Sequence, residues 1–424
     1  MSKAKIVFIG AGSMSFGIPT FKDLFTTREL EQSTLSLVDI DEQNLERMYQ
    51  LALKMNEASG MNLRIEKTNN RRDVLPGADY VVNSLAIERC ELWKKDFQVP
   101  LKYGIKHCLG ENGGPGALFF GMRTIPLIME ICKDMEELCP DAWFLNFSNP
   151  ESRIVLAVNQ YTNIKCIGLC HGIFMAQDDV SKVLGREKES IEVSAAGMNH
   201  FQWLLSIRDR ETGANLYEEL REKEKSYDSK FEPFTRKMFR AVGMWPTCSD
   251  DHLGEYLPYG YEAGMEGYDF DKDEQERIQM KKDVREVIDG EAGAEKWLVK
   301  SGEKAMEVIT ALHTGKRTFI PSAVVYNGGA ITNLPDDVAV EIPIIVDKDG
   351  VHKVHIGNLP QNISSLLSLQ VGAQQMAVRA AMYGDKEMAY QALLADPVIN
   401  STDAARNIVD ELWEVNKAYI KRTL

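Results

Sequence analysis

Residues Lys5-Ile-Val-Phe-Ile-Gly-Ala-Gly-Ser13 decide the fold class of this chain. A short apolar run ends at Gly10 and Gly12, and a helix-compatible stretch follows from about Pro19. A buried parallel strand that runs into a glycine turn and then a helix is typical of dinucleotide-binding domains. Gly10 permits a tight turn, and Gly12 lets the backbone approach a pyrophosphate on the free N–H groups of the helix. Because Ser15 replaces the third glycine of the usual pattern, a plain turn is the alternative.

An acidic residue follows the second predicted strand. The segment Thr34–Val38 is largely apolar and is followed by Asp39. A carboxylate at this position can accept hydrogen bonds from both hydroxyls of a ribose, and it would repel the 2′-phosphate of NADP. The glycine turn and the acid together therefore predict NAD as the cofactor. The contacts expected in this part of the chain come from Gly10, Gly12, Ser13, Met14 and Asp39.

The composition excludes several classes of partner. The chain has 424 residues, of which 44% are hydrophobic and 26% are charged, and its formal net charge is −14. This length allows two domains with sizeable cores. The negative charge argues against nucleic acid and anionic membranes as partners. We see no apolar run of transmembrane length and no CxxC pair among the seven cysteines, so we expect reduced thiols in a soluble cytoplasmic enzyme.

The pattern of the chain changes near residue 190. Apolar strands alternate with helical segments before it, and longer helical and charged stretches follow it. We therefore predict an α/β fold, with a Rossmann-type doubly wound parallel sheet of the lactate/malate dehydrogenase type in residues 1–190. An α+β domain in residues 191–424 is expected to close over the sheet edge. Further strands are expected at 63–67, 79–83, 142–147, 164–169, 191–195, 318–327 and 338–346, and further helices at 45–58, 362–383 and 403–424.

Polar residues follow several of these strands, at the edge where ligands of open α/β sheets bind. Asn83 ends the strand at 79–83, where it could contact the cofactor or simply form a turn. A glycine-rich loop at 110–116 precedes a helix that runs to about Leu138. Such a loop is either a flexible connection or a place where the backbone meets a ligand.

Cys170 and His200 are the strongest candidates for metal ligands. Each comes just after a predicted strand, so their side chains can converge on the carboxyl edge of the sheet. A thiolate, an imidazole and a few oxygen ligands would hold a divalent metal and leave positions open for substrate hydroxyls. The alternative is a buried cysteine and a core histidine with structural roles.

Six short motifs occur in a fixed order along the chain. They are Gly10-x-Gly12-Ser13, Arg123-Thr-Ile-Pro126, Asn149-Pro150, Cys170-His171-Gly172, Gly197-x-Asn199-His200 and Asn327-x-Gly-x-Ile331. This order resembles glycoside hydrolase family 4, an NAD-dependent exception to the two-carboxylate scheme of glycosidases. The resemblance runs through most of the chain, from residue 6 to about residue 345.

The resemblance implies a redox route to hydrolysis. NAD⁺ takes hydride from carbon 3 of the sugar, a base removes the proton on carbon 2, the aglycone leaves by elimination, and water then adds back. A divalent metal, usually Mn²⁺, polarises the oxygens on carbons 2 and 3. Carried over to this chain, Cys170 and His200 are the metal ligands. Asn149 and Asn199 would bind sugar hydroxyls or orient the metal site, and Asn149 is also expected near the cofactor. The family also implies a homodimer or homotetramer.

The acid and the base are less closely defined by the resemblance. His171 could assist departure of the leaving group, or it could be a sugar-binding histidine. The base is expected from the segment at 246–256, which is rich in titratable groups. Tyr256 and Asp250 are the two candidates. His252 is a further contact to the metal or substrate, whereas Glu255 is expected to cap or pair and Cys248 to be structural.

The sequence leaves the substrate and two other functions open. Cys170-His171 resembles members that act on unphosphorylated α-glycosides, and we favour α-galactosides, although Gly172-Ile-Phe174 departs from the α-galactosidase pattern. A sugar with an acidic group on carbon 6 is the alternative substrate. Arg123, Arg153 or Arg89 could pair with that group, or each could be a scaffold arginine. A simple NAD-dependent dehydrogenase and a non-catalytic NAD-binding sensor are the competing functions.

Overall fold

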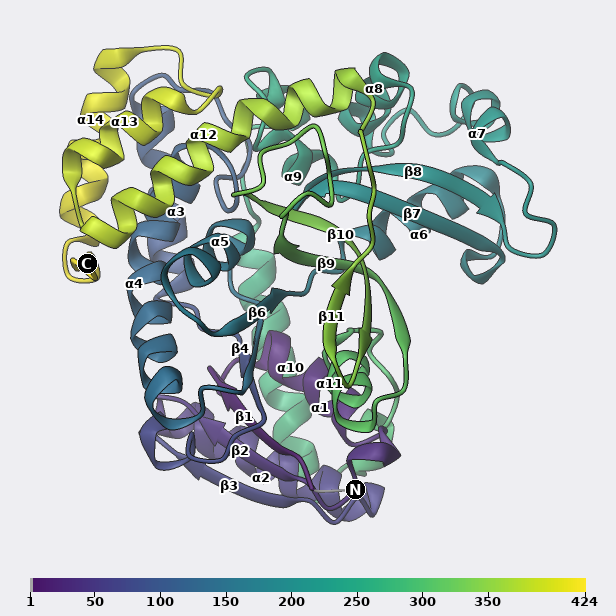
Figure 1. Ribbon diagram of the computed structural model, residues 1–424, viewed down its shortest axis with the longest axis vertical. Coiled ribbons are helices and arrows are strands. Elements are labelled where there is room, and N and C mark those ends of the chain that lie inside the picture. The colour runs from purple at the N-terminus through teal and green to yellow at the C-terminus, as the bar shows by residue number, and fades with distance from the viewer. Residues whose placement is uncertain (1–2) are drawn as a thin grey trace.

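The first half of the chain builds a parallel sheet covered by helices, as predicted. The computed structural model describes residues 3–424. In this half the strands pair in parallel in the order β3-β2-β1-β4-β5-β6. Helices lie on both faces of this sheet (Figure 1), which explains why the inner strands are buried almost throughout. The strands are β1 (Lys5–Ile9), β2 (Thr34–Val38), β3 (Arg64–Thr68), β4 (Tyr80–Asn83), β5 (Trp143–Asn146) and β6 (Lys165–Gly168).

The helices of this half follow the strands in alternation. The first begins directly after the glycine turn, so the expected start near Pro19 is wrong, and this proline lies inside the helix. Intrahelical bonds begin with the N–H of Gly17, which donates to Ser13, so Pro19 removes one such bond from the interior of this helix. The helices are α1 (Met14–Leu24), α2 (Glu42–Ser59), α3 (Arg89–Lys102), α4 (Gly114–Leu138), α5 (Glu151–Tyr161) and α6 (Gly172–Leu184).

The second half continues the same sheet with antiparallel strands. Residue Gly168 of β6 pairs with Val324, so the sheet crosses the predicted domain boundary at residue 190 without a break. The boundary itself stays a prediction. The added strands are β7 (Ile191–Met198), β8 (Phe201–Asp209), β9 (Thr318–Tyr326), β10 (Ala339–Asp347) and β11 (Gly350–Lys353).

The helices of the second half pack at both ends of this sheet (Figure 1). The last one ends at Asn416, earlier than predicted. Apolar residues on the two faces of the sheet form two large buried clusters. The helices are α7 (Tyr217–Glu224), α8 (Pro233–Val242), α9 (Asp250–Gly254), α10 (Phe270–Ile288), α11 (Ala305–Thr314), α12 (Gln361–Tyr383), α13 (Lys386–Ala395) and α14 (Thr402–Asn416); short 3₁₀ turns lie at Arg28–Leu30, Arg71–Asp73, Lys188–Ser190, Gly260–Ala263 and Ala294–Trp297.

One row of paired residues runs straight across the junction of the two halves. Gly168 on β6 pairs with Val324 on β9, Val324 pairs with Glu341 on β10, and Glu341 pairs with Gly197 on β7. The segments that follow β6 and β7 therefore leave the sheet at the same level. This register places Gly168 and Gly197 at the same level of the sheet, although β6 and β7 run in opposite directions, because three antiparallel pairings separate them.

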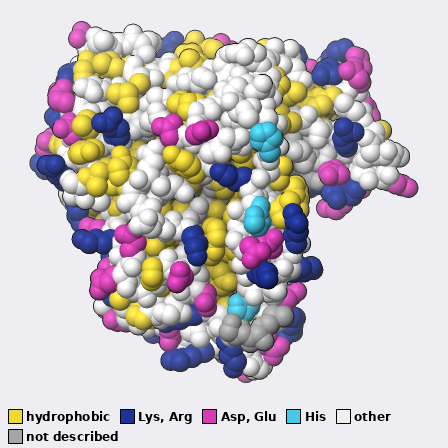
Figure 2. Space-filling view, in the orientation of Figure 1, with side chains coloured by type: hydrophobic (Ala, Val, Ile, Leu, Met, Phe, Trp, Pro, Cys, Tyr) yellow, Lys and Arg dark blue, Asp and Glu magenta, His cyan; other side chains and the backbone are white. Residues whose placement is uncertain are grey.

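Helix α4 is the main apolar element of the interior. Within residues 3–424 it is long and apolar enough to cross a membrane, which the sequence analysis did not expect. However, 89% of its apolar window is buried, and α4 packs against α3, α5 and α12, so it is a core helix of the fold. Charged side chains of both signs are mixed over the face of the molecule shown in Figure 2.

The structure places Arg123 in this core rather than at a substrate site. Its guanidinium on α4 is fully buried and pairs with Asp96 on α3, at 2.7 Å between Nη2 and Oδ2. Its Nη1 donates to Asn416 on α14 at 3.2 Å, and the guanidinium lies over the ring of Phe120. This geometry corrects the substrate role expected for Arg123 and supports the scaffold alternative, because all of its charge is used inside the helix packing.

We expect the change Arg123→Met to lower the free energy of unfolding by about 3–5 kcal/mol, because it leaves the buried Asp96 carboxylate without its cation. The double variant with Asp96→Leu should regain much of the loss, since both charges are then gone. Lys102→Met on α3 is a control for the loss of an ion pair between helices, because it removes the exposed partner of Glu411 on α14 and should cost at most about 1 kcal/mol. Denaturant unfolding measures all three, and equal costs for the two single variants would contradict a structural role for Arg123.

Candidate functional site

The glycine turn after β1 forms a cradle that only glycine can line. The N–H of Gly12 donates to Oδ2 of Asp39 at 2.8 Å, and a Cβ atom on Gly12 would lie 2.7 Å from the same oxygen. Gly10 has a φ of +79°, and a Cβ there would lie 2.8 Å from the carbonyl oxygen of Ser84. Ser13 precedes α1 without a side-chain cap bond, so the first N–H groups of α1, which starts at Met14, remain available to an anion. The turn therefore fits a dinucleotide pyrophosphate.

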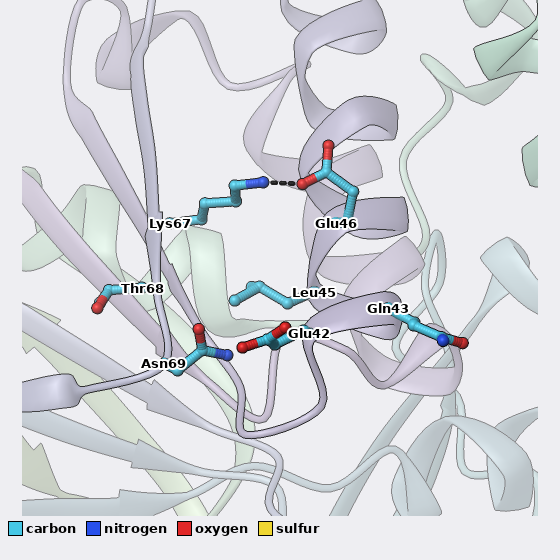
Figure 3. A pocket seen from close by; sticks show the side chains of 7 residues that line it. All are labelled: Glu42, Gln43, Leu45, Glu46, Lys67, Thr68 and Asn69. Atoms are coloured by element: carbon cyan, nitrogen blue, oxygen red, sulfur yellow. Dashed lines mark ion pairs between the residues drawn. The ribbon is translucent and has the colours of Figure 1, made fainter.

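Asp39 lies at the end of β2, where a ribose-binding acid is expected. Its Oδ2 accepts from Gly12, and its Oδ1 accepts the N–H of Asp41 at 2.9 Å. A carboxylate has about four acceptor positions, so it retains capacity for hydroxyl donors. Next to it, a pocket of about 580 Å³ lies between the start of α2 and the end of β3 (Figure 3). None of the predicted site residues lines this pocket, in which Lys67 and Glu46 form an ion pair.

The side chain of Asn83 forms hydrogen bonds within the protein, at the carboxyl edge of the sheet. It is buried, and its Nδ2 donates to Oδ1 of Asn146 and to Oγ of Ser148, both at 2.9 Å. These bonds tie the ends of β4 and β5 together, which fits the strand-ending alternative. Asn149 follows Ser148 and is half-buried at the same edge. Contacts of Asn83 and Asn149 with a cofactor stay predictions.

His200 stands at the tip of a hairpin that the sequence analysis did not foresee. Met198 pairs with Phe201, so only Asn199 and His200 connect β7 to β8. His200 has a φ of +58°, a left-handed conformation that is uncommon for residues other than glycine. Both residues are buried, and Nδ2 of Asn199 donates to Glu341 at 3.0 Å. The hairpin thus holds the imidazole in a fixed position at the end of the sheet.

Cys170 follows β6, at the level of the sheet where the His200 hairpin lies. Its thiol is half-buried, accepts the N–H of Gly172 at 3.4 Å, and is hydrogen-bonded to the thiol of Cys248. A Cβ on Gly172 would lie 2.4 Å from the sulfur of Cys248, so the two thiols can meet only because residue 172 is glycine. Cys170 and His200 come shortly after Gly168 and Gly197, the two ends of the row of paired residues. The hydrogen bond to Cys248 and burial raise the pKa of Cys170, and the carboxylate of Glu341 in that row adds to the rise.

Two imidazoles stack beside these thiols. The ring of His252 lies 4.4 Å from that of His200, with an interplanar angle of 18°. Burial and the neighbouring His252 hold the pKa of His200 well below its usual value, so the His200 ring is neutral, the form that binds metals. Ligand atoms of His200, His252 and Glu255 lie within 4.8 Å of one another. Two imidazoles and a carboxylate are a donor set that can hold a divalent metal, and a role for the Cys170 thiol as a ligand stays a prediction.

Glu255 both caps and pairs, as the sequence analysis expected, but its partners could not be foreseen. Its buried Oε2 accepts three backbone N–H groups, from Glu111 and Asn112 at 2.6 Å and from Gly113 at 3.0 Å. Its Oε1 lies 3.4 Å from Nδ1 of His252. The glycine-rich loop was visible in the sequence as a place where the backbone meets a ligand, but its partner is a side chain of this chain.

The structure treats the two candidate bases differently. Tyr256 is buried, its ring stacks on Phe201, and its hydroxyl donates to the carbonyl oxygen of Asn199 at 2.9 Å. Burial raises its pKa well above 10. The carboxylate of Asp250 instead accepts the N–H groups of Phe234 and Thr235 at 2.9 and 2.6 Å, which caps α8. Tyr256 is therefore joined to the His200 turn, whereas both oxygens of Asp250 face another helix.

The remaining predicted residues lie outside the cluster of His200, His252 and Glu255. His171 is exposed before α6, and its Nδ1 lies 3.6 Å from Glu303. Arg89 lies 3.7 Å from Glu111 in the glycine-rich loop and stacks on Trp93. Arg153 is buried, and its Nε and Nη1 have no hydrogen-bond partner within residues 3–424. Buried acids missed by the sequence analysis, Glu151 and Glu341, lie behind the thiols, and burial raises the pKa of both carboxyl groups.

Comparisons with known proteins cover nearly the whole chain. The model described as Family 4 glycosyl hydrolase matches residues 5–186, and the model of its C-terminal domain matches residues 195–399. An α-galactosidase of Bacillus subtilis (strain 168) is 32% identical over 415 residues, which cover 96% of this chain and 95% of the relative. A probable 6-phospho-β-glucosidase of the same organism is 32% identical over 436 residues, covering 98% and 97%.

Other relatives carry the names α-glucosidase, in Erwinia rhapontici at 30% identity, and α-galacturonidase, in Thermoanaerobacter italicus at 28% identity. A solved 6-phospho-α-glucosidase from gut microorganisms, in complex with NAD and Mn²⁺, shares the fold with a TM-score of 0.84 at 22% identity, over 100% of both chains. The two family models and the relatives at 30% identity or more show that this chain belongs to family 4 of the glycosyl hydrolases.

Proposed function

We propose that this chain is an NAD- and divalent-metal-dependent glycosidase that cleaves unphosphorylated α-glycosides, with α-galactosides favoured. The observation that carries the proposal is the cluster of the neutral His200 imidazole with His252 and Glu255, in a fold that also holds a dinucleotide-type glycine cradle. When bound, NAD⁺ would accept hydride from carbon 3 of the sugar, and the metal would polarise the neighbouring oxygens. Membership of a glycosidase family argues against the two competing functions, a simple dehydrogenase and a non-catalytic NAD-binding sensor.

Side chains of this chain would bind the sugar and carry out the proton transfers. Asn149, Asn199 and His252 would orient the sugar hydroxyls, and the orphaned Oδ1 of buried Asn199 is a free acceptor for one of them. Tyr256 would take the proton from carbon 2 as a phenolate, after losing the proton that its hydroxyl donates to Asn199, since both oxygens of Asp250 already cap α8. His171, which is exposed before α6, would assist departure of the aglycone.

The preference for an α-linked, unphosphorylated sugar rests on relatives named α-galactosidase and α-glucosidase. Relatives named α-galacturonidase support the alternative of a sugar with an acidic group on carbon 6. Two arginines remain available for that group, Arg89 beside the glycine-rich loop and Arg153 with its unpartnered nitrogens. We also propose a cytoplasmic enzyme, in keeping with its seven free cysteines, that works as a homodimer or homotetramer.

The test is the release of p-nitrophenol from α-galactoside, α-glucoside and α-galacturonide, together with 6-phosphorylated α- and β-glucosides. We expect release from an unphosphorylated α-glycoside that is lost when either NAD⁺ or Mn²⁺ is removed, without net NADH. In D₂O the sugar product should carry deuterium on carbon 2, because that proton is exchanged before water adds back. Release that needs neither cofactor would contradict the redox route, and release from phosphorylated sugars alone would contradict the substrate class.

The two candidate bases are separated by a pair of nearly isosteric variants. Tyr256→Phe should lower kcat by about 10²-fold or more, since it removes the proton acceptor but keeps the stacked ring. Asp250→Asn should leave kcat within about threefold, because the amide oxygen keeps one of the two bonds that cap α8 and the loss falls away from the His200 turn. Steady-state kinetics with NAD⁺ binding as the check of folding measure both. A large loss of kcat in Asp250→Asn, with the Tyr256 variant active, would assign the base to Asp250.

A further inference from the structure

Asn112 contacts the Nδ1 nitrogen of His200. Its carboxamide nitrogen Nδ2 lies 3.1 Å from Nδ1, across 88 positions of sequence, and both side chains are buried. Its oxygen Oδ1 has no hydrogen-bond partner within residues 3–424. Whether the nitrogen or the oxygen of this carboxamide faces Nδ1 needs an explanation, because one of the two atoms lacks a partner within residues 3–424 in either orientation.

The tautomer of His200 supplies that explanation. A neutral imidazole carries its proton on one nitrogen, and only the other nitrogen can bind a metal. When Asn112 donates to Nδ1, the proton lies on Nε2 and blocks it. A half-turn of the carboxamide exchanges its nitrogen and oxygen in nearly the same space. Oδ1 then accepts the Nδ1 proton, and Nε2 is free.

The backbone around Asn112 cannot move away from His200. Its N–H donates to Oε2 of Glu255 at 2.6 Å, and the N–H groups of Glu111 and Gly113 bind the same oxygen. A Cβ on Gly113 would lie 2.6 Å from the carbonyl oxygen of Glu255, so the loop and α9 are in direct contact. The side chain of Asn112 can therefore turn, whereas its distance from the imidazole is fixed.

We propose that Asn112 is a positioning residue that accepts the Nδ1 proton of His200 and thereby keeps Nε2 free for the metal. The inference rests on the proposed role of His200 as a ligand. Ligand histidines generally donate their second N–H to such a partner, and loss of the partner typically weakens metal binding by about 10- to 100-fold. Asn112 acts through His200 and needs no contact with the substrate.

Two variants of Asn112 with side chains of similar size distinguish the effect of the hydrogen-bond acceptor from that of side-chain volume. Asn112→Asp keeps an acceptor and removes the donor, whereas Asn112→Leu removes both. The tautomer of His200 is measured in the metal-free enzyme by ¹⁵N NMR of histidine-labelled protein, with the His200 signal identified by its loss in His200→Gln. Mn²⁺ affinity is measured by electron paramagnetic resonance, and NAD⁺ binding checks the fold.

We expect the Nδ1–H tautomer in the wild type and in Asn112→Asp, and a mixture in Asn112→Leu with Mn²⁺ affinity lower by about 10- to 100-fold. The inference is overturned if the wild type carries its proton on Nε2, or if Asn112→Leu keeps both the tautomer and the affinity. Unchanged Mn²⁺ affinity in His200→Gln would instead refute His200 as a ligand, and this inference with it. The two failures are therefore distinguishable.

Discussion

The buried carboxylate of Glu255 holds the candidate site together. It lies in the chain just after α9, yet it accepts the N–H groups of the loop before α4, which comes from the other half of the protein. Asp396 acts in the same way on the next residue of that loop, because it accepts the N–H of Gly114 and, at 3.0 Å, that of Val398. A buried charge is tolerated only when its hydrogen bonds are made, so these carboxylates and the start of α4 fix each other.

This constraint explains the composition of the loop. Gly113 lies against the backbone of Glu255, and a Cβ on Gly116 would lie 2.6 Å from the carbonyl oxygen of Gly110. The glycines are therefore present because two backbones approach closely, and flexibility is not needed to explain them. The same reasoning applies to Gly172, whose missing side chain leaves room for the two thiols. In both places a residue without a side chain lets functional groups come together.

The sheet supplies the second constraint. Its parallel half carries the glycine cradle and the Cys170 strand, and its antiparallel half carries the His200 hairpin. They meet where Gly168 pairs with Val324, and the next residue of that row, Glu341, is completely buried and accepts from Ser322 and Asn199. This acid sits behind the thiols in a region of low polarity, where electrostatic interactions are strong. A dehydrogenase-like half and a hairpin from the second half thus form one site across a continuous sheet.

The sequence by itself determined the features that arise within a few residues. The apolar run from Lys5, the glycine turn and Asp39 could be predicted because strand periodicity and turn geometry are local. Cys170 and His200 could be proposed because both follow predicted strands, and the order of motifs identified the family. Local patterns also predicted most strands of the parallel half.

Tertiary structure alone decided what these residues contact. Arg123 pairs with Asp96 and Asn416, Asn112 reaches His200, and Glu255 binds the glycine-rich loop, and each contact joins segments far apart in the chain. The burial of Tyr256 and the capping role of Asp250 were equally invisible, because two neighbouring titratable residues differ only in the direction of their side chains. Such directions depend on how distant helices pack, and no local propensity encodes them.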